Sequence, residues 1–265
     1  MKMKKTAALL FLVALVMFPS HLLAWGDNGH RIIGQVALCH LNKKAEKKVR
    51  ALLSGADLPM ECTWGDFIKS DSAYNEYSAW HYCDFPADMT REAFDTLALD
   101  NPHGECIYRV GYLVNHLMKH PNDTMMLKLL IHIVGDLGCP MHLGRPSDRG
   151  GNDFLVKWFR APANLHNVWD SRIIDSQRLC YTEYAHHLYN TQRIPDQVYA
   201  KGKEIDWGWE TYQLTQKIYA YSEDDENQGK DLSYRYVYDF LDVLNRQLYL
   251  TGCRLAAVLN YIYSK

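Results

Sequence analysis

The segment 123–137 constrains the fold more than any other part of the sequence. Apolar residues lie nearly all round the helix that its periodicity predicts, so this helix belongs at the centre of the molecule. His132 and Asp136 interrupt the apolar pattern, and their spacing of four places both side chains on one face. Burying an imidazole and a carboxylate without partners is costly. The two residues therefore form either a buried His–Asp hydrogen bond or part of a metal site.

Helical periodicity also dominates the rest of the chain. The patterns predict long helices from Asp27 or Asn28 to about Gly55, over Cys106–Lys119 and over 232–263, and shorter ones over 164–174, 183–189 and 209–221. Residues 154–159 follow a Gly-Gly-Asn turn signal and suit one half of a small hairpin. No linker, repeat or low-complexity tract divides the chain, which indicates a single domain. Together with the helical periodicity, this predicts a mainly α, single-domain helical bundle with a small β-hairpin. Such a bundle can hold a metal cluster in a cleft between helices.

The first 24 residues have the features of a signal peptide. Lys2, Lys4 and Lys5 form a basic start, an apolar run follows over 7–17, and Ala24 offers a small residue before a cut. An uncleaved membrane anchor is the alternative, but the apolar run is too short to cross a bilayer comfortably. We therefore expect a signal peptide over 1–24 and a mature chain over 25–265, exported to the periplasm or the medium without a membrane anchor.

The charge balance argues against a basic nucleic-acid-binding surface. The full chain has a net charge of −2, and removing the leader with its three lysines makes the mature chain more acidic. A protein that grips polyanions through surface lysines and arginines has the opposite balance. If this chain acts on nucleic acid, bound cations must supply much of the attraction.

All seven cysteines follow the leader. Export to an oxidising compartment favours disulfide bonds, although the spacing does not reveal the connectivity. Because seven is odd, at least one thiol is free or pairs outside the chain.

The pattern of His132 and Asp136 recurs further along the chain. His166 and Asp170 have the same spacing on a second predicted helix, and His142 follows the Gly-Cys-Pro break after the first. Two such pairs and a further histidine favour a metal over a simple hydrogen bond, because imidazole and carboxylate together are a common zinc set. Three upstream candidates, each unremarkable on its own, are His30, Asp66 and His81.

The ordered set of these residues resembles the S1/P1 nuclease family, in the superfamily that also holds zinc-dependent bacterial phospholipases C. Members of this family begin their mature chain with a tryptophan whose amino group and carbonyl oxygen bind zinc. In this chain the nine matching positions are Trp25, His30, Asp66, His81, His132, Asp136, His142, His166 and Asp170.

The resemblance implies three Zn²⁺ ions per chain. The first would be held by Asp66, His81, His132 and Asp136. The second would take Trp25, His30 and a shared Asp136. The third would take His142, His166 and Asp170. Two zincs that share a carboxylate can lower the pKa of a common water, and the resulting hydroxide would attack phosphorus without a side-chain nucleophile.

The resemblance also assigns substrate contacts. Lys69, three residues after Asp66, would lie against the phosphate, and we expect these two residues to act in catalysis. Tyr82 would stack on an unpaired base and Asp84 would accept from its amino group. Asn152, in the Gly-Gly-Asn turn, would lie near the phosphate. Taken singly, each of these residues also suits an ordinary protein surface.

These features predict an exported zinc-dependent endonuclease and 3′-nucleotidase. Its substrates would be single-stranded RNA and DNA and 3′-nucleotides, cut to leave 5′-phosphates, and no stable protein partner is implied. The alternative is a phospholipase C or other phosphoesterase with the same tri-zinc site; Tyr82 and Asp84 favour the nuclease because a lipid head group has no base to clamp. A metal-storing or structural binding protein is a third hypothesis, but such sites are usually closed by their ligands.

Overall fold

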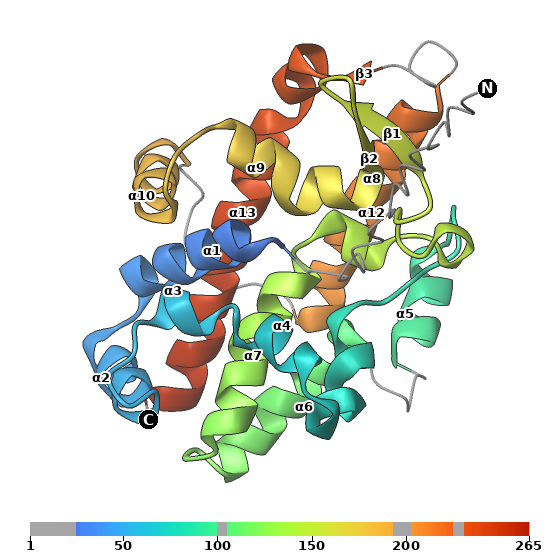
Figure 1. Ribbon diagram of the computed structural model, residues 1–265. Coiled ribbons are helices and arrows are strands. Elements are labelled where there is room, and N and C mark those ends of the chain that lie inside the picture. Colours follow the sequence, from blue (N-terminus) through green and yellow to red (C-terminus); the bar gives the residue numbers. More distant parts are fainter. Residues whose placement is uncertain (1–24, 100–104, 193–202, 225–230, 265) are drawn as a thin grey trace, which may run out of the picture.

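The computed structural model describes residues 25–99, 105–192, 203–224 and 231–264 (Figure 1). The predicted signal peptide, residues 1–24, lies outside the described residues. The described chain is mainly helical, as the periodicity predicts, and its buried apolar side chains form one continuous core.

Three long helices form the centre of this core. α7 (Thr124–Leu137) packs against α6 (Cys106–Lys119), and α13 (Tyr234–Tyr263) runs the length of the molecule and contacts both α7 and α1 (Asp27–His40) (Figure 1). Asp123 caps α7 by accepting from the Met126 amide at 3.1 Å. The prediction of these helices from apolar periodicity is confirmed, with α6 starting and ending at the predicted residues.

The prediction of a single helix from Asp27 or Asn28 to about Gly55 is wrong. α1 ends at His40, and α2 (Lys43–Leu52) begins after Asn42, whose side chain accepts from the amides of Lys44 and Ala45 at 3.1 and 3.0 Å. An asparagine that satisfies two orphan amides starts a new helix even where apolar spacing continues across it. The cap position of α1 is Gly26, one residue before the expected cap.

Further helical elements, from three to 20 residues long, connect these helices. They are α3 (Leu58–Glu61), α4 (Trp64–Phe67), η1 (Ile68–Ser70), η2 (Ser72–His81), α5 (Arg91–Leu99), η3 (Pro140–Leu143), η4 (Pro146–Asp148), α8 (Leu165–Asn167), η5 (Val168–Arg172), α9 (Ile173–Ser176), α10 (Tyr181–Thr191) and α12 (Glu204–Glu223). The predicted helix over 164–174 corresponds to α8, η5 and α9, where the helix widens into one π-type turn. α5 has no counterpart among the predicted helices.

A small sheet completes the fold. β1 (Leu155–Trp158) pairs antiparallel with β2 (Ala161–Asn164), which confirms the hairpin, and β3 (Asp231–Leu232) adds a short parallel partner on the other side of β1. β2 leads directly into α8, so the hairpin fixes where His166 enters the core.

Two further observations concern the described residues. None of their helices combines the length and the apolar character that crossing a membrane requires. They include all seven cysteines, and no disulfide joins any two of them, so the expected disulfides are not present.

Candidate metal centre

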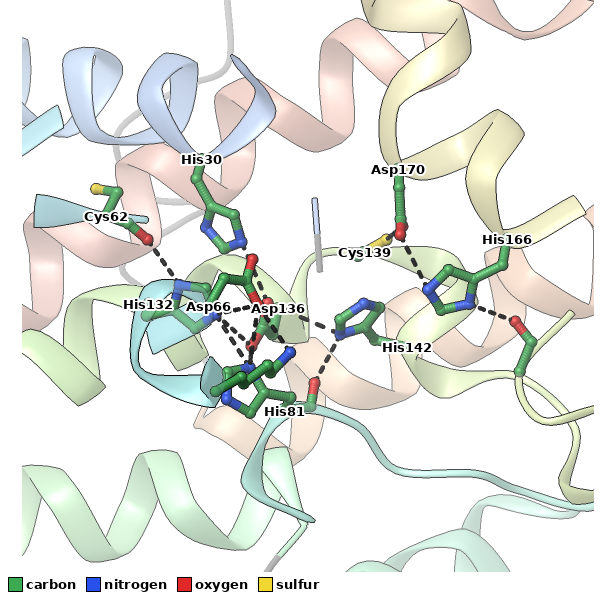
Figure 2. A network of polar contacts seen from close by, with 12 residues as sticks. His30, Cys62, Asp66, His81, His132, Asp136, Cys139, His142, His166 and Asp170 are labelled. Atoms are coloured by element: carbon green, nitrogen blue, oxygen red, sulfur yellow. Dashed lines mark hydrogen bonds and ion pairs between the residues drawn. The ribbon is translucent and has the colours of Figure 1, made fainter. Parts of the chain in front are cut away.

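The inner face of α7 carries the first cluster of candidate ligands. His132 and Asp136 are fully buried, and Nε2 of His132 lies 3.2 Å from Oδ2 of Asp136. His81, the last residue of η2, brings its Nδ1 to 2.9 Å from the same oxygen. His30, from the first turn of α1, approaches the other oxygen of Asp136, with Nε2 at 3.3 Å from Oδ1. Asp136 therefore lies between imidazoles contributed by three different elements (Figure 2).

α4 delivers Asp66 to this cluster. Its Oδ1 lies 3.7 Å from Nε2 of His132 and 3.9 Å from Nδ1 of His81, and it accepts from Nζ of Lys69 at 2.7 Å. The preceding Gly65 makes this approach possible, because a Cβ at that position would lie 2.4 Å from the His132 ring. The sequence prediction did not assign a role to Gly65, although its position beside a candidate ligand was a usable signal.

His142, His166 and Asp170 form the second cluster. Nε2 of His166 lies 2.9 Å from Oδ2 of Asp170, and the rings of His142 and His166 have centroids 5.3 Å apart. The two clusters adjoin, because Nδ1 of His142 is 3.8 Å from Oδ1 of Asp136 (Figure 2). Cys139 belongs to the second cluster as well: its thiol donates to Oδ1 of Asp170 at 3.1 Å. The sequence prediction missed this cysteine.

Backbone carbonyls determine the tautomers of three histidines. Nδ1 of His132, His142 and His166 lies 2.7, 2.6 and 2.7 Å from the carbonyl oxygens of Cys62, His81 and Gly150. A carbonyl can only accept, so each Nδ1 is the protonated nitrogen and Nε2 holds the lone pair when the ring is neutral. A metal-binding histidine is typically oriented in this way.

The first cluster contains buried polar atoms that the described part of the chain leaves unsatisfied. They are both ring nitrogens of His30, both oxygens of Asp136 and Oδ2 of Asp66. In addition, Nε2 of His132 and Nδ1 of His81 face each other at 3.0 Å. Native proteins rarely leave such groups without partners, and several converging lone pairs suit a cation. The donor set therefore fits bound metal.

The electrostatics agree with this interpretation. Burial lowers the pKa of His30, His81 and His142, that of His81 to about 4. Burial alone would raise the pKa of Asp136, but the neighbouring His132, His30 and His81 hold it well below its usual range. Burial also disfavours charge on His132, yet Asp136 and Asp66 outweigh it and raise the pKa of that ring. The negative charge of Asp136 and Asp66 that favours a proton on this ring also attracts a metal cation.

Three groups of side chains have ligand atoms close enough to share an ion. They are His30, Asp66 and His132; His81, His132 and Asp136; and Cys139, His142 and Asp170. Together with His166, eight of the nine predicted ligands thus lie in the two clusters. Trp25 is buried two residues before α1, and the next amide, from Gly26, donates to the backbone carbonyl of Asp170 at 2.9 Å.

The predicted substrate residues lie around these clusters. Lys69 contacts Asp66, and Tyr82 is 41% exposed immediately after His81. Asp84 lies beside the turn at Gly150, and burial, with Asp148 and Glu105 nearby, raises its pKa to about 6. Asn152 follows that turn, and its side-chain amide donates to the Arg149 carbonyl at 2.8 Å.

Comparison with known proteins agrees with this geometry. A sequence model described as S1/P1 Nuclease matches residues 25–264. The chain belongs to the S1/P1 nuclease family. Among its relatives in this family, "Endonuclease 4" of Arabidopsis thaliana is 29% identical, over 91% of this chain and 90% of the relative. "Endonuclease 2" of the same plant is 31% identical, over 90% of each chain. "Nuclease S1" of Aspergillus oryzae is 25% identical over 68% of this chain and 66% of its own length.

Membership of the S1/P1 nuclease family makes the chain a phosphodiester hydrolase that acts on nucleic acid. The family is metal-dependent, and the buried His and Asp groups supply sites that could bind metal.

Proposed function

We propose that residues 25–265 form the catalytic domain of an exported zinc-dependent endonuclease and 3′-nucleotidase. Its substrates are single-stranded RNA, single-stranded DNA and 3′-nucleotides, and its products carry 5′-phosphates. Residues 1–24 act as a signal peptide, and the mature protein is periplasmic or secreted. Family membership and the two ligand clusters support this proposal.

The position of Asp136 is the observation that most strongly supports this proposed function. One oxygen of this carboxylate lies 3.3 Å from His30, and the other lies 2.9 and 3.2 Å from His81 and His132. A carboxylate with imidazoles on both sides is suited to bind two metal ions at once, one through each oxygen. Asp66, His81, His132 and Asp136 would hold one zinc. His30, the amine and carbonyl of Trp25 and the same Asp136 would hold the other.

The second cluster offers the residues that would hold a third zinc. His142 and His166 hold their Nδ1 protons on backbone carbonyls, which directs Nε2 lone pairs away from the backbone, and Asp170 contributes a carboxylate beside His166. Three protein ligands leave a coordination position for a substrate oxygen, as in catalytic rather than structural sites.

When bound, the zinc ions supply a water of lowered pKa as the nucleophile and positive charge against the phosphate. The chain's own residues then position the substrate. Lys69 offers an ammonium group against a phosphate oxygen, and its contact with Asp66 orients it. Tyr82 presents an exposed ring to a base, and Asp84 accepts from a base amino group. Stacking of this kind needs an unpaired base, which favours single strands. Asn152 contacts the phosphate from the adjoining turn.

Cleavage before Trp25 is part of the proposal. The backbone nitrogen of Trp25 can bind zinc only as a free terminal amine, because an amide nitrogen has no available lone pair. While a leader is attached, this nitrogen is part of a peptide bond and cannot bind zinc.

A substrate panel tests the function. We expect the processed, zinc-loaded protein to cleave single-stranded DNA and RNA and to release phosphate from 3′-AMP, with each activity abolished by EDTA. Phosphatidylcholine vesicles serve as the comparison substrate. Hydrolysis of the lipid alone would replace the nuclease with a phospholipase C, and absence of any EDTA-sensitive phosphodiesterase activity would point to a metal-binding protein.

A further inference from the structure

Cys139 connects the two halves of the candidate metal centre. It lies three residues after Asp136 and three before His142, at the break between α7 and η3. Its amide donates to the carbonyl of Asp136 at 2.9 Å, and its own carbonyl accepts from the amide of His142 at 3.1 Å. Gln247 of α13 donates to the neighbouring carbonyl of Gly138 at 2.9 Å, so the segment is held from outside as well. The backbone thus fixes where the Cys139 side chain lies.

The thiol makes a specific contact with one candidate ligand. Cys139 is fully buried, and its Sγ donates to Oδ1 of Asp170 at 3.1 Å. The other oxygen of Asp170, Oδ2, lies 2.9 Å from Nε2 of His166 (Figure 2). The two oxygens therefore have different surroundings: one faces a neutral donor and the other faces a second ligand. A carboxylate oriented in this way presents one oxygen to an ion.

We propose that Cys139 is a positioning residue of the third metal site, where its S–H group holds Oδ1 of Asp170 and so directs Oδ2 toward the ion bound by His142 and His166. This inference rests on the metal centre proposed above. The thiol does for Asp170 what the backbone carbonyls do for the histidines, since each fixes one atom of a ligand and leaves the other for metal.

The geometry favours this role over direct ligation by sulfur. Sγ lies near ligand atoms of both His142 and Asp170. A sulfur ligand, however, would close the site with four protein groups, whereas three leave room for the substrate. The hydrogen bond from Sγ to Asp170 also uses the proton that ligation would remove.

Zinc binding to purified, processed protein tests the role. We expect Cys139→Ala to bind the third zinc about 10- to 100-fold more weakly in competition with a chromophoric chelator, because Oδ1 loses its donor and Asp170 can rotate. Cys139→Ser keeps a donor of similar reach and should retain most of the affinity. The two zincs of the first cluster should be unaffected in both variants. Cys253→Ala, at an equally buried cysteine of α13, is the matched control for loss of packing.

Cobalt substitution distinguishes positioning from ligation. The Co²⁺-loaded wild type should lack a thiolate-to-metal charge-transfer band, and Cys139→Ala should shift the visible bands of the third ion while Cys139→Ser leaves them in place. A charge-transfer band that disappears in both variants would make Cys139 a ligand and overturn the proposal. Wild-type affinity in Cys139→Ala would also overturn it. If wild-type protein binds no zinc, the metal centre itself fails, which is a different outcome from either.

Discussion

The two ligand clusters differ in how their polar atoms are satisfied. Around Asp136, the protein packs three imidazoles against one carboxylate and leaves both of its oxygens, together with the nitrogens of His30, without hydrogen bonds from the described residues. Around Asp170, one oxygen accepts from Cys139 and the other faces His166. Each carboxylate has one oxygen that faces an imidazole lone pair, but Asp170, unlike Asp136, also accepts from a hydrogen-bond donor, the thiol of Cys139.

This difference indicates separate roles. Unsatisfied buried groups cost stability, and a ligand that binds the folded state recovers it. The first cluster should therefore need metal both for stability and for chemistry. The candidate ligands of the second cluster are held by backbone and thiol contacts, so we expect them to bind and release an ion with less rearrangement.

Asp136→Asn should have the largest effect and should separate the two clusters most clearly. The amide can no longer bridge two ions, so we expect loss of more than one zinc equivalent from the first cluster and a fall in turnover of about 10³-fold or more. The second cluster should keep its zinc. Metal analysis alongside steady-state kinetics measures both effects, with His186→Ala, an exposed histidine on α10, as the control that changes neither. Retention of three zincs in Asp136→Asn would contradict the bridging role.

One extra residue before Trp25 should remove a single ion. The amine becomes an amide, so the zinc bound by Trp25 and His30 should be lost while the other two remain. Mass spectrometry of the intact chain, with metal analysis of the same sample, gives the result. Three zincs on the extended chain would show that the amine is not a ligand.

Gly65→Ala should damage the first cluster through packing. The new methyl group would lie 2.4 Å from the His132 ring, so either that ring or α4, with Asp66, must shift. We expect a loss of about 1–3 kcal/mol in the free energy of unfolding and weaker zinc binding in the first cluster only. Gly111→Ala is the control, because the atoms nearest to its methyl group would belong to the flexible side chain of Glu204. Unchanged melting and metal content in Gly65→Ala would refute this close approach.

Asp84→Asn should have the smallest effect, beside the second cluster. Because burial raises the folded-state pKa of Asp84 to about 6, its contribution to stability is present below its unfolded pKa near 3.8 and is lost as pH rises through 6. Asparagine does not ionise, so the metal-free variant should melt on the order of 2–4 °C higher than wild type at pH 7, and this difference should vanish as the pH falls below 3.8.

The same substitution should weaken base recognition. Losing the charged acceptor should raise KM for single-stranded substrate about tenfold, with little change in kcat. If Asp84→Asn is more stable than wild type but has the same KM, Asp84 does not belong to the base-binding site.

Local sequence patterns predicted much of the fold and of the candidate metal centre. The apolar pattern with His132 and Asp136 predicted the central helix and the first two candidate ligands, because helical spacing alone decides which side chains share a face. The break at Asn42 was missed because a capping side chain competes with periodicity and the pattern does not show which prevails. Cys139 and Gly65 were missed for a different reason: their roles depend on contacts with Asp170 and His132, which are distant in sequence and meet only in the folded chain.

Metal stoichiometry of the exported protein, measured on a sample whose first residue has been identified by N-terminal sequencing, is the most direct test of the central claim. We predict three zinc equivalents per chain on a protein that begins at Trp25. One equivalent or none on that processed chain, or three on a chain that begins elsewhere, would contradict it.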